Sequence, residues 1–183
     1  MKQPMTDTQL LDLYREPATR NQGFTALVRQ YQQQVYYFVR KMVVDHDDAN
    51  DVTQLVFIKV WKGLDGFKGD AKLSTWMYRI AMNESITFLN KQKKIAGIPL
   101  DQVEHSLSQS LEADVHYDGD AIQRKLQTAV ATLPDKQRTV FILKYFEARQ
   151  YKEISEITGT SVGALKASYH HAVQKIEKYL TAS

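Results

Sequence analysis

Apolar residues recur along most of this chain at intervals of three and four, the spacing of one face of an α-helix. The clearest run extends over about five turns, between Phe24 and Met42. Its members are Phe24, Leu27, Val28, Tyr31, Val35, Phe38, Val39 and Met42. No stretch alternates convincingly between polar and apolar residues, as a half-buried strand would. The sequence therefore predicts an all-α protein.

Capping residues and periodicity place the other helices. Ser74 or Thr75 is expected to cap one helix and Asp120 another, because short polar side chains satisfy the first free N–H groups. Leu133 and Pro134 open a further helix, since Pro is tolerated in a first turn. The remaining helices are predicted over residues 49–64, 75–91, 121–132, 151–157 and 162–180.

Charge divides the chain into three parts. Residues 1–94 carry 14 basic and 10 acidic side chains, residues 95–122 carry no basic and six acidic ones, and residues 123–183 carry ten and five. The middle part also has weak periodicity, so we expect an acidic linker between two small helical domains. Two basic domains on a tether fit two contacts with one polyanion. An unevenly charged, solvated surface is the alternative.

Several classes of chemistry are excluded. Cysteine is absent, which removes disulfides, thiol catalysis and Cys-ligated metals, and fits a reducing, cytoplasmic compartment. No phosphate loop, nucleophile elbow or paired acid and base is present, so we expect no enzyme, no cofactor and no small-molecule substrate. A calcium loop beginning at Asp114 would need Glu where Lys125 stands. The adjacent His170 and His171 diverge by about 100° on a helix and cannot chelate a metal together.

A helix, a Gly-containing turn and a Ser-capped second helix over residues 151–180 form a helix-turn-helix pattern. The inward face would carry Leu165, Tyr169, Ala172, Val173, Ile176 and Leu180. The outward face carries Lys166, Ala167, His170, His171 and Gln174. Small, basic and hydrogen-bonding side chains suit a major groove. A plain helical hairpin with a Gly turn is the alternative.

The first domain offers a second polar stripe. It consists of Arg79, Asn83, Thr87, Asn90 and Lys94, spaced along one helix face. The preceding segment FKGDAKLSTW interleaves Phe67 and Trp76 with Lys68 and Lys72, a combination suited to unstacked bases. A solvated helix face, with Trp76 in the core, is the alternative.

Three stretches resemble the extracytoplasmic-function (ECF) group of bacterial RNA polymerase sigma factors in order and spacing: DDANDVTQLVFIKVW, FKGDAKLSTWMYRIAMN and LPDKQRTVFILKYFE…YKEISEITGTSVGALKASYHHAV. The resemblance implies a sigma region 2 domain (residues 1–94) and a region 4 helix-turn-helix domain (residues 123–183). It implies a sigma factor that binds core polymerase and directs promoter-specific initiation. The residues implied to contact the largest polymerase subunit are Asp51, Gln54, Phe57 and Ile58. Leu55 stands where many members have Glu.

By the same resemblance, two sets of residues recognise promoter DNA. The melted minus-ten element would meet Phe67, Lys68, Lys72, Trp76, Arg79, Asn83 and Thr87. The minus-thirty-five duplex would meet Lys166, Ala167, His170, His171 and Gln174. Members of the group commonly have Arg where Ser168 and His171 stand.

An anti-sigma factor is a further partner that the resemblance brings in. Two other functions stay open at this stage. An autonomous helix-turn-helix regulator would need only the second domain, which leaves Asp51 and Gln54 without a purpose. A sigma-like decoy for an anti-sigma regulator would have no need of a DNA-binding face, yet Arg79, Asn83 and Lys166 are present.

Overall fold

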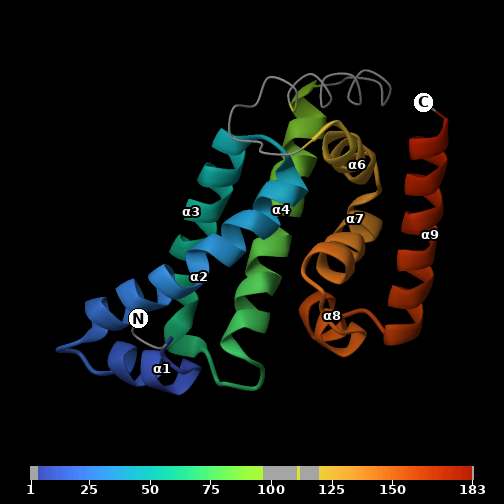
Figure 1. Cartoon of the computed structure of the whole chain (residues 1–183). Coiled ribbons are helices and arrows are strands. Elements are labelled where there is room, and N and C mark those ends of the chain that lie inside the picture. Colours follow the sequence, from blue (N-terminus) through green and yellow to red (C-terminus); the bar gives the residue numbers. More distant parts are fainter. Residues whose placement is uncertain (1–3, 97–110, 112–119, 183) are drawn as a thin grey trace.

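Every element is helical in the part of the chain that the computed structural model describes, residues 4–96, 111 and 120–182 (Figure 1). This confirms the all-α prediction there, and none of these helices is long and apolar enough to cross a bilayer. The first half contains α1 (Asp7–Arg15), α2 (Arg20–Val43), α3 (His46–Gly63), the 3-10 turn η1 (Leu64–Gly66) and α4 (Leu73–Ala96). The second half contains α6 (Ala121–Ala131), α7 (Asp135–Phe141), the π-helical turn η2 (Ile142–Phe146), α8 (Tyr151–Thr158) and α9 (Val162–Thr181).

The apolar face of α2 forms the centre of the first half, where it packs against α1, α3 and α4 (Figure 1). The predicted positions that are buried are Leu27, Tyr31, Val35, Phe38, Val39 and Met42. Phe24 and Val28 belong to the same spacing but are only partly buried. Burying a large apolar side chain contributes about 1.5–3 kcal/mol, so this face supplies much of the stability of the first half.

Helix α3 begins earlier than its periodicity predicts, at His46 instead of Ala49. The side chain of Asp45 accepts a hydrogen bond from the Asp48 backbone N–H at 2.9 Å and so caps the helix. Asp47 and Asp48 then lie in the first turn, where negative charge is favourable beside the helix dipole.

The predicted N-cap of the helix that carries the first-domain polar stripe is wrong. Helix α4 begins at Leu73 and extends to Ala96, beyond the expected end near Lys91. Ser74 and Thr75 lie inside the first turn, and Thr75 is buried. The reason is that a carboxylate from α1 satisfies the first N–H: Leu73 donates to Asp7 Oδ2 at 3.2 Å.

The second half confirms the helix-turn-helix prediction. Gly159 ends α8 in the left-handed region, with φ of 70°, which glycine adopts without strain. Ser161 caps α9 by accepting a hydrogen bond from the Ala164 N–H. The inward face of α9 is the expected one, with Leu165, Ala172 and Ile176 buried. Asp120 caps α6 as predicted, whereas Pro134 occupies the N-cap of α7 and not its first turn.

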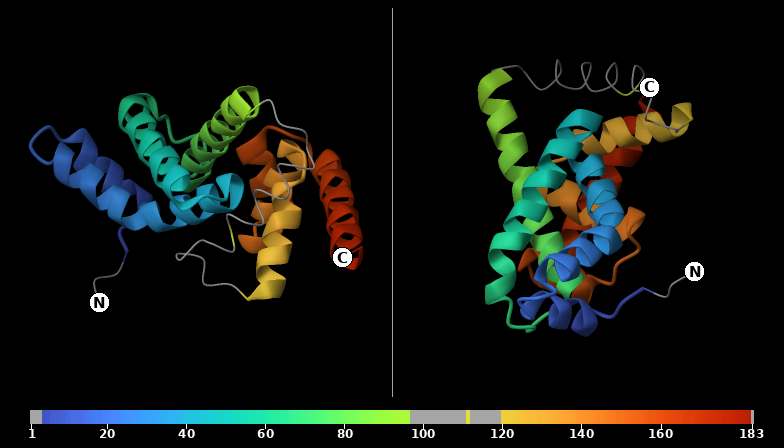
Figure 2. Two further views of the ribbon diagram at one scale, coloured as in Figure 1. Left: turned by 90° about the horizontal axis from the view of Figure 1, so that it is seen from above. Right: turned by 90° about the vertical axis from the view of Figure 1, so that its left-hand side faces the viewer.

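The two halves pack side by side (Figure 2). Their buried side chains form one continuous cluster. Helix α4 lies along α8, and α2 contacts α6 and η2. Most of the predicted acidic linker, residues 95–122, falls outside the described residues, so its role as a tether stays a prediction.

A glycine allows α1 to approach α2 closely. A Cβ atom at Gly23 would lie 2.5 Å from the Tyr14 backbone nitrogen and 2.8 Å from the Leu13 carbonyl carbon. Real Cβ atoms do not approach backbone so closely, and backbone cannot rotate away as a side chain can. In α9, by contrast, a Cβ at Gly163 would meet open space.

Replacing Gly23 by Ala is therefore expected to lower the free energy of unfolding by about 1–3 kcal/mol, because α1 must move away from α2. Gly163→Ala is the matched control, and it is expected to be neutral or to stabilise by up to about 1 kcal/mol, since Ala is the better helix former. Urea denaturation of both variants and the parent measures the difference. Equal effects of the two substitutions would contradict the close packing of α1.

Candidate protein and nucleic-acid interfaces

The outer face of α3 carries the side chains predicted to dock on polymerase. Asp51 and Gln54 are exposed, and Ile58 and Leu55 each keep 49% of their surface exposed. Phe57 differs, because only 9% of it is exposed and it packs into the core. The α3 face therefore presents a carboxylate and an amide beside exposed aliphatic surface, with Phe57 behind them.

A groove of about 860 Å³ lies between α2 and α3, next to these residues. Its lining is contributed by Phe24, Val28, Arg29, Gln32, Gln33 and Tyr36 of α2 and by Asn50, Thr53, Gln54, Phe57, Ile58 and Trp61 of α3. His46 joins the two helices, with Nδ1 at 2.7 Å from the Tyr36 hydroxyl and Nε2 at 3.0 Å from the Asn50 amide nitrogen. Such a groove, mostly apolar with a few amides, can accept side chains of a partner helix.

Sequence reasoning assigned only the α3 side of this groove. On α2, Phe24 and Val28 fit the same helical period as the core residues, so spacing alone cannot separate them. The neighbouring segment that became α3 carries the distinguishing signal, because its apolar residues cover a wider arc than one core-facing side needs. They are Val52, Leu55, Val56, Phe57, Ile58, Val60 and Trp61.

The loop before α4 encloses a pocket of about 220 Å³. It is lined by Gly66, Phe67, Lys68, Gly69, Asp70, Ala71, Thr75, Trp76 and Arg79. The rings of Phe67 and Trp76 lie 5.1 Å apart at 41° and are both partly buried, while Lys68 and Lys72 are exposed near them. Trp76 also packs against α3, because its ring reaches 3.0 Å from where a Gly63 Cβ would lie. Trp76 thus belongs both to the predicted aromatic pair with Phe67 and to the edge of the core.

The polar stripe of α4 lies at the surface, as the sequence predicts. Arg79, Asn83, Thr87 and Asn90 are exposed, and Met77 and Ala81 are buried on the opposite side. The stripe begins at the boundary with the second half, where the Arg79 guanidinium donates a hydrogen bond to the Glu156 carbonyl oxygen of α8. Nucleotides could therefore reach most of the stripe, while its first turn is partly covered.

The outward face of α9 is open over its whole predicted length. Lys166, Ala167, His170, His171 and Gln174 are all exposed. The Lys166 ammonium lies 5.9 Å from the centre of the Tyr151 ring. This cation–π contact places the lysine side chain beside α8. A shallow hollow of about 400 Å³ continues the polar face toward Gln137, Lys175 and Lys178.

Polar contacts join the two halves. The Tyr78 hydroxyl of α4 donates to Glu147 Oε2 at 3.0 Å, and the Arg149 guanidinium lies 4.0 Å over the Tyr78 ring. Burial, together with the nearby Glu147 carboxylate, raises the pKa of Tyr78 to about 12, so the phenol stays a donor at neutral pH. Arg138 donates through Nη1 to the Met42 carbonyl at 2.9 Å, and burial lowers its pKa to about 10.

Three ion pairs across this boundary share one polarity. They are Lys41–Glu147 at 3.9 Å, Lys72–Glu153 at 3.8 Å and Lys93–Asp135 at 3.0 Å. In each pair the cation belongs to the first half and the carboxylate to the second. Lys72 and Lys93 are exposed, so each of their pairs contributes only about 0–1 kcal/mol. The Lys41–Glu147 pair is largely buried, and burial lowers the pKa of Lys41, so the attraction is offset by the cost of desolvation.

No group of three metal-ligating side chains occurs among the residues with described positions. The acidic segment from Asp114 to Gly119 lies outside them. His170 and His171 have ring centres 6.0 Å apart and do not converge on one point.

Comparison with known proteins supplies independent information. Residues 27–95 match the sigma-70 region 2 family model, and residues 123–176 match the sigma-70 region 4 model. The chain is 30% identical to the ECF RNA polymerase sigma factor SigW of Bacillus subtilis, over 86% of this chain and 89% of the relative. It is 28% identical to the RNA polymerase sigma-H factor of Pseudomonas aeruginosa, over 95% and 93% of the two chains.

A solved structure shares the fold. The sigma factor RpoE of Bartonella quintana, crystallised with the anti-sigma factor NepR, superposes with a TM-score of 0.67 and 20% identity. The match covers 86% of this chain and 96% of that one.

Proposed function

Since the chain belongs to the ECF group of bacterial RNA polymerase sigma factors, we propose that its three exposed surfaces divide the work of promoter selection. The α3 face and its groove hold core polymerase, the loop pocket and α4 stripe read the melted minus-ten strand, and α9 reads the minus-thirty-five duplex. The chain itself catalyses nothing and acts in the cytoplasm, where polymerase is. The observation that carries the proposal is that all three surfaces are exposed on one chain while each helix buries its opposite side.

Docking on polymerase follows from the chemistry of α3. Exposed aliphatic surface at Leu55 and Ile58 provides area that gains free energy on burial, at about 25 cal/mol per Å². Asp51 and Gln54 supply an acceptor and an amide that orient a partner helix, and a basic partner surface would pair with the carboxylate. Leu55 in place of the common Glu shifts this contact from charge toward apolar packing.

Recognition of the minus-ten strand requires a place for a base that has left its stack. Extruding one base costs a few kcal/mol, and stacking on an aromatic ring returns about 1–3 kcal/mol. The Phe67 and Trp76 pair can therefore hold one or two extruded bases at a net free-energy cost close to zero. Many more base-pair steps must open in a transcription bubble, at about 1.4 kcal/mol each. The chain alone cannot supply that energy, so opening depends on polymerase.

Reading both promoter elements requires the two halves to separate. Their names place the elements about 25 base pairs apart, which is about 85 Å of duplex. In the closed arrangement Arg79 of the minus-ten stripe contacts Glu156 of the helix-turn-helix motif. The segment between Ala96 and Ala121 can reach about 80 Å when extended, at about 3.3 Å per residue. The extended segment alone is slightly shorter than this spacing, and the helices that carry the two surfaces supply the difference, since α9 by itself is about 30 Å long.

The two other candidate functions explain less of the chain. An autonomous regulator would not need the groove beside Asp51 and Gln54, and a decoy would not need an exposed α4 stripe. An anti-sigma factor fits as a regulatory partner, because a solved sigma factor of this fold is bound to one.

Replacing Asp51 and Gln54 together by Ala is expected to weaken binding to core polymerase about tenfold or more, because central interface residues carry most of the binding energy. Both side chains are exposed, so the unfolding transition should not change. Titration of core polymerase into the fluorescently labelled chain measures the affinity. Asp47→Ala, exposed on the first turn of α3, is the control. An unaltered affinity of the double variant would remove α3 from the docking surface.

Lys166→Ala is expected to weaken holoenzyme binding to minus-thirty-five duplex and to reduce the slope of log affinity against log salt by about one unit, if Lys166 neutralises one phosphate. Lys178→Ala, about three turns further along α9, is the control and should leave the slope unchanged. The measurement is a binding isotherm at several salt concentrations. An unchanged slope for Lys166→Ala would mean that this lysine does not meet a phosphate.

The opening of the two halves can be followed directly, because the chain has no cysteine to interfere with labelling. Fluorophores at Lys62→Cys and Lys175→Cys, both exposed, would report on the two halves by energy transfer. Glu147→Ala removes the acceptor of Tyr78 and the partner of Lys41, so we expect lower transfer in the free chain. The exposed Glu177→Ala is the control. Core polymerase with promoter DNA should lower the transfer further, and a constant transfer would contradict opening.

A further inference from the structure

A residue from α1 caps the DNA-facing helix α4. The Leu73 N–H donates to Asp7 Oδ2 at 3.2 Å, although 66 positions separate the two residues. Lys72 occupies the N-cap position, since its carbonyl accepts from the Trp76 N–H at 3.1 Å, but its ammonium cannot accept a hydrogen bond. Asp7 thus supplies the acceptor that Ser, Thr, Asn or Asp usually provides locally. It also places negative charge at the positive end of the helix dipole.

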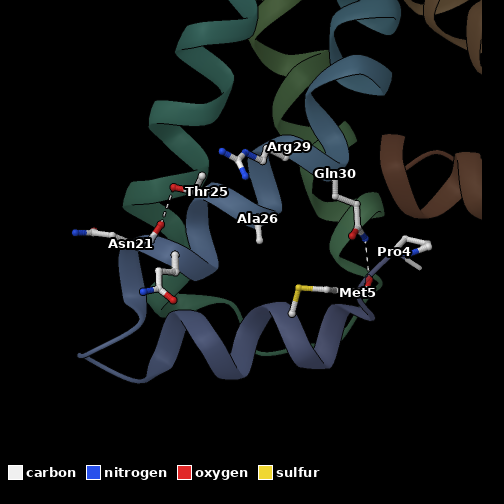
Figure 3. Close-up of a pocket in the computed structure, with 8 residues that line it drawn as sticks. Pro4, Met5, Asn21, Thr25, Ala26, Arg29 and Gln30 are labelled. Atoms are coloured by element: carbon white, nitrogen blue, oxygen red, sulfur yellow. Dashed lines mark hydrogen bonds between the residues drawn. The ribbon is translucent and has the colours of Figure 1, made fainter. Parts of the chain in front are cut away.

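Asp7 is held in this position by α2. Its other oxygen, Oδ1, accepts a hydrogen bond from the Tyr31 hydroxyl at 2.5 Å. Burial, and then the bond to Asp7, raise the pKa of Tyr31 to about 12, so the phenol donates at neutral pH. Just before Asp7, the backbone is tied to α2 as well, because the Gln30 amide donates to the Met5 carbonyl at 2.9 Å (Figure 3).

The capped turn is one wall of the loop pocket. Residues 66–71 form the other wall and lead directly into Lys72 and Leu73, while Thr75, Trp76 and Arg79 follow within two turns. The start of the loop is anchored from the same corner of the molecule, because the Arg20 guanidinium donates to both carboxylate oxygens of Asp65 at 2.6 and 2.8 Å. Contacts from the α1–α2 corner therefore hold both ends of the loop.

We propose that Asp7 is a positioning residue for minus-ten recognition, an inference that rests on the proposed function. Its carboxylate does not touch DNA. It keeps the first turn of α4 closed and so sets the distance between the loop and the side chains of Trp76 and Arg79. The α1 helix, in which none of the predicted DNA-binding or docking residues lies, thereby contributes to base selection.

The test uses holoenzyme formed from core polymerase and the full chain. The probe is a pool of forked DNA fragments whose single-stranded minus-ten segment is randomised, and the bound fraction is sequenced. Asp7→Ala is expected to flatten the selected base frequencies about fivefold, the factor that corresponds to the typical loss of one N-cap contact. The amides of the first α4 turn should exchange with deuterium faster by a similar factor. Core binding should stay within about twofold.

Three further variants separate positioning from plain stability. Val39→Ala removes buried apolar volume from α2, about two turns away from Tyr31, so it should lower stability and keep base selection. Asp7→Asn keeps an acceptor oxygen without the charge and should fall between Asp7→Ala and the parent. Asp12→Ala removes an exposed carboxylate from the same helix and should change neither selection nor exchange.

Unchanged base selection by Asp7→Ala holoenzyme, or unchanged amide exchange in the first turn of α4, would overturn the inference alone. Equal loss of selection in Val39→Ala would also overturn it, because stability would then explain the effect. A parent chain that fails to bind core polymerase would overturn the proposed function, and the inference with it.

Discussion

The packing of α4 against α2 and α3 is the contact on which the functional surfaces depend. Met77 and Ala81 are fully buried on its inner side, while Arg79 and Asn83 are exposed. Because successive residues are about 100° apart around a helix, burying the inner side fixes the direction of every polar side chain on the outer one. The same rotation brings Trp76 against Gly63, where a larger residue would press on the ring. The loop pocket, the stripe and the boundary with α8 thus share one helix orientation.

Local signals in the sequence predict most of this fold, and they fail where distant residues act. Periodicity and caps place α6, α8 and α9 within about one or two residues, because both signals are contained in neighbouring positions. The start of α4 is missed because its cap, Asp7, lies in another helix, and no local pattern announces such a contact. The candidate site residues that are exposed lie on the outward helix faces that their spacing predicts. The α2 side of the groove is missed because a partly buried Phe24 and a fully buried Leu27 fit the same spacing.

The boundary between the halves combines apolar contact with polar groups that remain satisfied after separation. Tyr78, Glu147 and Arg149 can each exchange a protein partner for water, and the net contribution of one such hydrogen bond is about 0.5–1.5 kcal/mol. Arg138 is different, since burial lowers its pKa and its nitrogens donate hydrogen bonds to carbonyl groups of both halves. Opening would hydrate this guanidinium, which offsets part of the apolar contact that is lost. An arrangement of this composition suits the proposed separation of the two halves on binding to polymerase and promoter DNA.

The direction of the ion pairs explains how DNA could be that partner. Lys41, Lys72 and Lys93 belong to the half that carries the proposed minus-ten surface, and their carboxylate partners all belong to the other half. In the closed chain, Glu153 and Asp135 therefore neutralise lysines that phosphates could neutralise instead. Each exposed pair contributes little free energy, so replacing its carboxylate by a phosphate costs little. The exchange becomes favourable when counterions are released from DNA. On the proposed function, Lys72 and Lys93 thus exchange carboxylates of a second half that is itself net basic for phosphates of nucleic acid.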